Sequence, residues 1–156
     1  MKHKILALDI STKSTGWFFD LDNYGIITLD INLSLAKKLV LFRKELNKLL
    51  IKFKPKIVII EDVYYRPGFG NIHTVKVLSK FSGVATELIS SKKIKVIIVT
   101  TSAARKSLGL KHKVTKKDVF NFFIEKFKVD WNYNRMNDVT DAWVLKYAYE
   151  EGYKDK

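Results

Sequence analysis

Three nearly unbroken apolar runs stand out along the chain. They cover residues 4–10, 57–60 and 94–99. Runs of this length without polar alternation are typical of strands that are buried on both faces of a sheet. The sequence therefore predicts three buried strands.

The region after the first run has the pattern of a hairpin. The β-rich segments 17–19 and 26–29 flank an Asx/Gly turn at residues 22–25. Two such segments around a short turn are typical of paired antiparallel strands. With the run at 4–10, they predict a three-stranded antiparallel meander.

The remaining segments repeat their apolar residues at helical spacing. Helices are predicted over 34–53, 72–91, 102–108 and 115–127. Ser34 and Thr115 are the predicted N-caps of the first and the last of these. A final helix is predicted to start near Asp138, after a loop over 132–137. A meander followed by alternating helices and strands predicts an α/β fold in which helices cover a mixed sheet. The length of 156 residues predicts one domain over 1–156.

Four carboxylates occupy special places in this pattern. Asp9 and Glu61 come at the carboxyl ends of two predicted strands, where active sites gather in such sheets. Asp138 and Asp141 are three residues apart, so they share a helix face, here the apolar one. If the two strands are neighbours, all four carboxylates meet, and we expect no cation paired with them.

An oxygen-only ligand set of this kind suits Mg²⁺ or Mn²⁺ and not Zn²⁺. Two such ions about 4 Å apart can cleave a phosphodiester. Helix-dipole capping is the alternative explanation for Asp138 and Asp141, because acids are favoured in the first turn of a helix.

The net charge of the chain indicates which kind of partner it binds. The chain has 29 Lys and Arg against 16 Asp and Glu, a net charge of +13. Such an excess favours a polyanionic partner, although a Lys-rich surface alone is the alternative.

Disulfides and thiolate zinc sites are excluded because the chain has no cysteine. The sequence has neither an 18-residue apolar run nor a long enough apolar start for a signal peptide, so we expect a protein of the cytoplasm, or of a host cytoplasm, with no membrane partner.

Two regions are candidates for contacts with DNA. The loop 64–71 is both aromatic and basic, through Tyr64, Tyr65, Arg66 and Phe69. Its rings could stack on unpaired bases or fold back on the core. Further basic candidates lie on the short helix and the connector after it: Arg105, Lys106, Lys111, Lys113, Lys116 and Lys117.

The helix predicted over 72–91 is a candidate for self-association. Its small residues would let another helix approach closely, and apolar neighbours would supply area removed from water. The proposed contact residues are Val75, Leu78, Ser79, Ser82 and Gly83, with Ala85 and Ile89 on the same face. The alternative is that this face packs on the protein's own sheet.

Three stretches carry a resemblance to a known family. They are Leu8–Ser11 with Thr15–Trp17, Ile60–Tyr64, and Asn137–Ala142. They resemble the three motifs of RuvC-type Holliday junction resolvases, members of the ribonuclease H-like superfamily, and the match runs from Lys4 to about Tyr149. The loop at 64–70 and the lysine density look more like phage or poxvirus-type members.

The resemblance implies a five-stranded ribonuclease H-like sheet and a Mg²⁺-dependent homodimer, with Mn²⁺ as a substitute, that resolves four-way junctions by paired cleavage. It implies Asp9, Glu61, Asp138 and Asp141 as metal ligands. It also implies that Tyr64 contacts bases at the crossover and that Lys116 lies near the scissile phosphate.

Other functions stay open at this point. A ribonuclease H or integrase-type nuclease would share the fold, although a ribonuclease H needs a ligand from its first long helix, where Glu45 is the candidate. A sugar-kinase or actin-like ATPase has a similar first phosphate loop but needs two such domains. A junction-binding module without catalysis is the third alternative.

Overall fold

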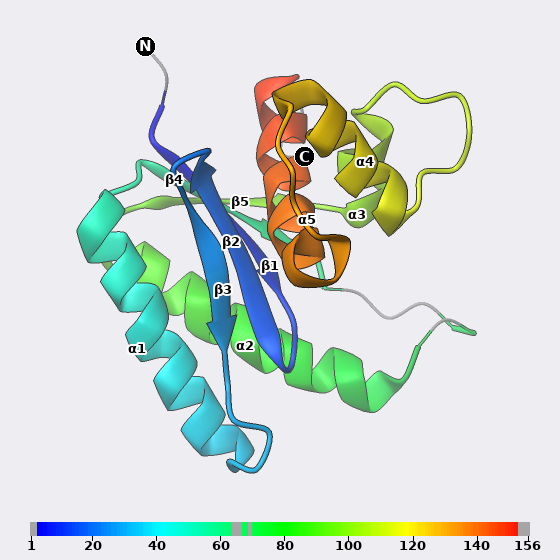
Figure 1. Cartoon of the computed structure of the whole chain (residues 1–156). Coiled ribbons are helices and arrows are strands. Elements are labelled where there is room, and N and C mark those ends of the chain that lie inside the picture. Colours follow the sequence, from blue (N-terminus) through cyan, green and yellow to red (C-terminus); the bar gives the residue numbers. More distant parts are fainter. Residues whose placement is uncertain (1–2, 64–66, 69, 153–156) are drawn as a thin grey trace.

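The computed structural model describes residues 3–63, 67–68 and 70–152 (Figure 1). Its elements in chain order are β1 (Ile5–Ile10), β2 (Ser14–Asp20), β3 (Asn23–Thr28), α1 (Leu35–Phe53), β4 (Ile57–Glu61), α2 (Ile72–Ser91), β5 (Lys95–Val99), α3 (Thr101–Lys106), α4 (Lys116–Phe127) and α5 (Tyr133–Glu150). Each helix in this described part is too short or too polar to cross a membrane.

The described strands form one mixed sheet in the order β3-β2-β1-β4-β5. The first three strands are antiparallel, and β4 and β5 run parallel to β1. Helices α1 and α2 cover one face of the sheet, whereas α3, α4 and α5 cover the other (Figure 1). The predicted fold class, including the meander and the helical layers, is confirmed.

Strand β1 shows how the sheet separates two cores. Its odd positions, Ile5 and Ala7, pack in the core beneath α5, and its even positions, Leu6 and Leu8, pack in the core beneath α1 and α2. Successive side chains of a strand point to opposite faces. Asp9 continues the odd series and therefore faces the α5 layer.

The predicted helix starts are largely confirmed by their caps. The Ser34 hydroxyl accepts a hydrogen bond from the Lys37 amide at 3.3 Å. Thr115 and Asp118 form a reciprocal capping box at the start of α4. The strand β2 begins earlier than predicted, at Ser14, because its pairing with β1 extends to Thr15 opposite Ile10.

The start of the last helix was predicted wrongly. Residues 133–137 belong to α5 and not to a loop, and the amides of Arg135 and Met136 donate to the Asn132 carbonyl at 3.2 and 3.0 Å. The first turn contains no acid, since Asp138 comes one turn later. Helix-dipole capping therefore does not explain Asp138 or Asp141.

Gly16 permits a close approach between α5 and β2. A Cβ atom added at Gly16 would lie 2.1 Å from the carbonyl oxygen of Asp138. No side chain fits at that distance, so the lack of a Cβ lets the two backbones touch. This contact fixes the height at which Asp138 stands over the sheet.

Replacing Gly16 with Ala should lower the free energy of unfolding by about 1–3 kcal/mol, because α5 must shift to relieve the overlap. Chemical denaturation measures this loss. Gly83→Ala is the matched control, since a Cβ added there meets nothing within 4 Å and alanine favours a helix. An unchanged stability for the Gly16 variant would show that the two backbones are not in contact.

Candidate active site

Asp9 and Glu61 meet where two parallel strands end. The pairing of β1 with β4 runs to Leu8 opposite Ile60, so the next residue of each strand is a carboxylate. The two carboxyl groups are close enough for each to shift the pKa of the other. The two strands are therefore neighbours, which is the condition under which the sequence analysis expected the acids to meet.

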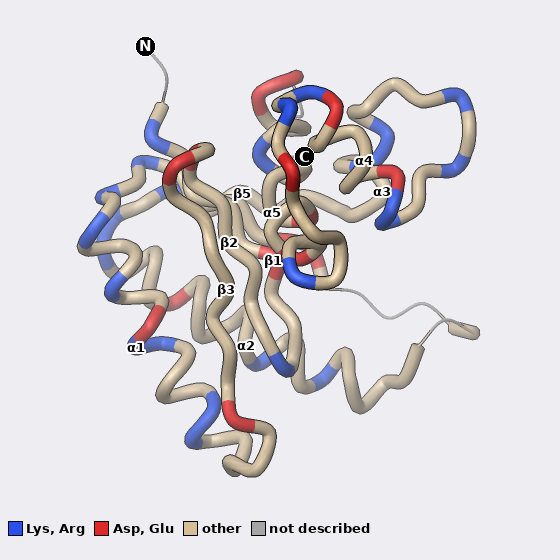
Figure 2. Tube along the Cα trace, viewed as in Figure 1, with Lys and Arg blue, Asp and Glu red and all other residues tan. Residues whose placement is uncertain are grey.

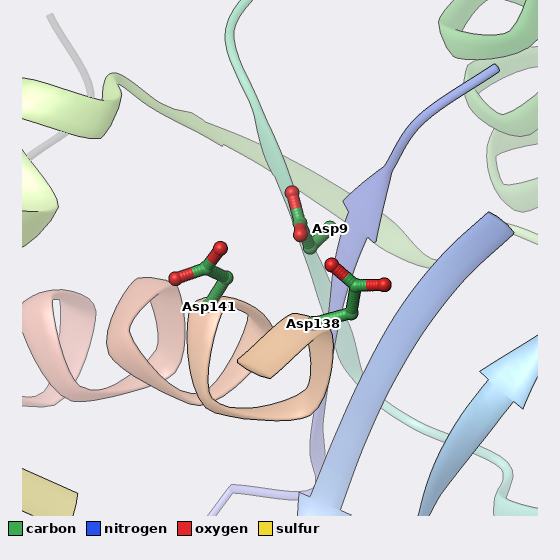
Figure 3. Close-up of side chains that lie close together, drawn as sticks. All are labelled: Asp9, Asp138 and Asp141. Atoms are coloured by element: carbon green, nitrogen blue, oxygen red, sulfur yellow. The ribbon is translucent and has the colours of Figure 1, made fainter. Parts of the chain in front are cut away.

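Helix α5 brings two further carboxylates to this point. One carboxylate oxygen from each of Asp9, Asp138 and Asp141 lies within 4.8 Å of those of the other two. Figure 3 shows the three side chains converging from β1 and from one side of α5. Glu61 is outside this group of three but is linked to it through Asp9.

Lys116 is paired with the carboxylates, so the expectation of no paired cation was wrong. Its Nζ atom lies 3.1 Å from Asp138 Oδ1 and 2.9 Å from Asp141 Oδ2. Lys116 is the first residue of α4, which packs along α5. This packing brings together charges that are more than 20 residues apart in sequence.

Two hydroxyl groups that the sequence analysis missed support the acids. The Ser14 hydroxyl donates to Asp138 Oδ2 at 3.3 Å, and the Thr101 hydroxyl donates to Glu61. Thr101 is the first residue of α3, two residues after the end of β5, so the rule that sites gather at strand ends could have found it. Ser14 stands at the start of β2 and carried no comparable signal.

Burial raises the pKa values of the three innermost acids. The pKa of Asp9 stands well above its ordinary value, first because of burial and then because of the charges of Asp141 and Glu61. Burial likewise raises the pKa values of Glu61 and Asp141, against hydrogen bonds from Asp9 and Lys116 respectively. The protein therefore holds negative charge here at a cost in stability.

Lys116 compensates part of this charge. Burial lowers the pKa of Lys116, but its hydrogen bonds and attraction to Asp141 and Asp138 outweigh burial and raise the pKa above its ordinary value. One ammonium group does not balance four carboxylates. A hard divalent cation fits this oxygen-only donor set and its excess of negative charge.

The predicted DNA contacts have varied positions. Tyr64, Tyr65, Arg66 and Phe69 lie outside the described residues. The basic candidates other than Lys116 lie on three segments. Arg105 and Lys106 are on α3, Lys111 and Lys113 are exposed on the connector, and Lys117 is on α4. The charge of Arg105 acts on Glu61 and Asp141, so α3 and α4 put positive charge beside the acids (Figure 2).

The candidate self-association face of α2 is partly open. Its outer positions are half-buried or exposed in the single chain: Val75, Leu78 and Ser82 are half-buried, and Ser79 and Gly83 are exposed. Ala85 and Ile89 were grouped with them wrongly, because both are fully buried in the core beneath α1 and α2.

Comparison with known proteins places the chain in a family. The model of the family described as crossover junction endodeoxyribonuclease RuvC matches residues 10–146. The chain belongs to this family. Family membership makes it a hydrolytic endonuclease of the junction-resolving, divalent-metal-dependent kind that binds branched DNA.

The individual relatives are distant. The crossover junction endodeoxyribonuclease RuvC of Fusobacterium nucleatum is 25% identical over 152 residues, which cover 91% of this chain and 77% of the relative. Among solved structures, Thermus thermophilus RuvC in complex with Holliday junction substrate has a TM-score of 0.75 at 9% identity, covering 94% of this chain and 92% of that one. The yeast mitochondrial Holliday junction resolvase Ydc2 has a TM-score of 0.65 at 13% identity, covering 96% and 78%. These likenesses confirm the ribonuclease H-like fold.

Replacing Asp9 with Asn should stabilise the protein at neutral pH when no divalent ion is present. A raised folded-state pKa means that the charged carboxylate opposes folding above that pKa, whereas both states are protonated below the ordinary value of 3.8. The gain should therefore shrink as the pH falls toward 3.8. Denaturant unfolding across this pH range measures it.

Asp22→Asn is the control for this prediction, because Asp22 is exposed in the β2–β3 turn and its amide should leave stability nearly unchanged. A loss of stability in the Asp9 variant at neutral pH would contradict the view that this carboxylate is held against the cost of burial and the repulsion of its neighbours.

Proposed function

We propose that the protein resolves four-way DNA junctions by hydrolysing one phosphodiester in each of two strands, using Mg²⁺ or Mn²⁺. The observation that carries the proposal is the convergence of Asp9, Asp138 and Asp141, whose carboxylate oxygens lie within 4.8 Å of one another. Because DNA is the substrate, the proposed place of action is the cytoplasm, or a host cytoplasm for a phage or poxvirus-type member.

The four acids are the proposed ligands of the cation. Asp9, Asp138 and Asp141 would bind it directly, and Glu61 would join them from the neighbouring strand. A bound cation would supply neutralisation of phosphate charge and activation of the attacking water. Ser14 and Thr101 orient two of these carboxylates through the hydrogen bonds that they donate to Asp138 and Glu61.

Lys116 supplies a second source of positive charge. Its ammonium group lies between Asp138 and Asp141, where a scissile phosphate would approach. In the proposed complex it donates to a phosphate oxygen and stabilises the charge that develops there. Its side chain is half-buried against the protein, which keeps the ammonium group near the acids.

The basic residues around the site would position the DNA. Arg105 acts electrostatically on Glu61 and Asp141, and Lys106, Lys111, Lys113 and Lys117 follow it on α3, on the connector and on α4. Contacts of this kind fix the register of a nucleic acid without reading its sequence. Tyr64, Tyr65, Arg66 and Phe69 are proposed to meet the unpaired bases of the crossover.

A ribonuclease H activity is the less favoured function. Glu45, the acid that would serve it, forms an ion pair with Lys48 at 2.8 Å on α1. Helix α1 covers the face of the sheet opposite α5, so Glu45 is on the other side of the sheet from Asp138.

Paired cutting gives a reason for a homodimer. One acidic site makes one cut, and two copies related by a two-fold axis make two. The face of α2 around Gly83 supports this proposal, because Gly83 has open space above it and Ile72 is 54% exposed. The proposed contact residues are Val75, Leu78, Ser79, Ser82 and Gly83.

Replacing Asp141 with Asn should reduce cleavage of a labelled four-way junction in Mg²⁺ or Mn²⁺ to the level of the blank. DNA binding should stay within a few-fold of wild type, because one charge changes and the fold does not. An RNA–DNA hybrid is the control substrate and should stay intact. Wild-type cleavage rates in the Asp141 variant would exclude the acidic site, and cleavage of the hybrid alone would favour a ribonuclease H.

Gly83→Arg should convert the dimer to a monomer and uncouple the two cuts, because a long charged side chain would enter the helix–helix contact. Analytical ultracentrifugation and the ratio of nicked to resolved junction measure the two effects. Ser90→Arg is the matched control at an exposed position two turns further along α2. A wild-type protein that is monomeric both free and on the junction would rule out the dimer.

A further inference from the structure

Six lysines from three separate segments gather at the sheet edge opposite the acids. They stand at or just before the amino ends of β1, β4 and β5, and all are exposed: Lys4, Lys54, Lys56, Lys92, Lys93 and Lys95. We call this set the lysine edge. The proposed function does not use it, because the acids stand at the other ends of the same strands.

Backbone hydrogen bonds hold the centre of the lysine edge together. The Lys56 amide donates to the Lys4 carbonyl at 2.8 Å, and the Lys95 amide donates to the Lys56 carbonyl at 3.3 Å. Lys4 and Lys56 therefore stand beside each other at the starts of adjacent strands, about 5 Å apart. Lys95 is in register with Ile57, one residue further along, so its side chain leaves the opposite face of the sheet. Together the three positions span about 10 Å across the edge, long enough to face several phosphates of duplex DNA, which carries one charge per roughly 1.7 Å of helix axis.

The turns at this edge use lysine where the backbone favours another residue. Lys54 and Lys93 have positive φ angles of 46° and 59°. Glycine or asparagine is the usual residue in this left-handed conformation, since other side chains are strained there. Backbone geometry therefore does not account for lysine at these two positions.

The lysine edge keeps most of its positive charge. No ion pair joins any of these lysines to an acid within the described residues. Asp20 and the exposed Asp22 border the edge in the turn after β2, where the Asp20 carboxylate accepts from Asn23 Nδ2 at 2.8 Å and from the Asp22 amide at 2.9 Å. Six lysines against these two acids leave the edge with an excess of positive charge, which suits a polyanion.

We propose that the lysine edge is a second DNA-binding surface, which holds the phosphate backbone of a duplex segment without reading its sequence. Lys4 and Asp9 are five residues apart on one strand, a distance of about 17 Å. A duplex held at the edge is thus a separate segment from the strand at the acids, such as a junction arm that bends back or a neighbouring duplex. The inference rests on the DNA-binding part of the proposed function.

The test removes three charges from the edge in the variant Lys56→Gln/Lys93→Gln/Lys95→Gln. The matched control removes three charges from the exposed side of α1, in Lys37→Gln/Lys44→Gln/Lys48→Gln. Fluorescence anisotropy with a linear duplex, repeated over a range of salt concentrations, gives the slope of log affinity against log salt. The edge variant should bind the duplex at least about tenfold more weakly, and its slope should be smaller by about one for each lysine that pairs with a phosphate in the wild type.

The control variant should keep nearly the wild-type slope, and both variants should still cleave a short-armed junction. Equal slopes for the two variants would mean that only the net charge of the protein affects its DNA affinity, and this would overturn the proposal. So would an edge variant that loses binding to vesicles with anionic lipid but keeps its duplex affinity. A wild-type protein that cleaves no junction would count against the proposed function. The difference in slope between the two variants would still show whether the lysine edge binds DNA.

Discussion

The close approach of α5 to β2 at Gly16 is the constraint on which the acidic site depends. Asp138 can stand near Asp9 only because its own carbonyl lies where a Cβ of residue 16 would be. The next helical turn then brings Asp141 to the same side. A shift of α5 away from the sheet would separate the carboxylates, so helix–sheet packing and site geometry are one property of this fold.

That packing forces like charges together, and the surrounding residues only partly relieve them. Burial raises the pKa of Asp9, and the charges of Asp141 and Glu61 raise it further. Lys116 and the hydroxyl donors Ser14 and Thr101 offset some of the repulsion. A site that stays strained in this way has a strong thermodynamic reason to bind a cation, and this agrees with the metal dependence of its family.

The sequence predicts the parts of this site that follow from local pattern. Strand alternation and strand ends were enough to identify Asp9 and Glu61, and helical spacing was enough to pair Asp138 with Asp141. The ion pairs of Lys116 were not predictable, because they depend on how α4 packs along α5. The early start of α5 was missed because Asn132 and its polar neighbours are typical of a loop, whereas in the structure the Asn132 carbonyl accepts the first helical hydrogen bonds.

The two ends of the central strands carry opposite charge, and this bears on how a polyanion could reach the acids. The net charge of +13 attracts DNA to the molecule as a whole, but four carboxylates at close range repel a phosphate. Positive residues such as Lys116 and Arg105 reduce that repulsion without removing it. The remaining charge must be neutralised before a phosphate can approach Asp9, so in this protein cation binding is expected to control access of the DNA backbone to the site as well as the chemistry there.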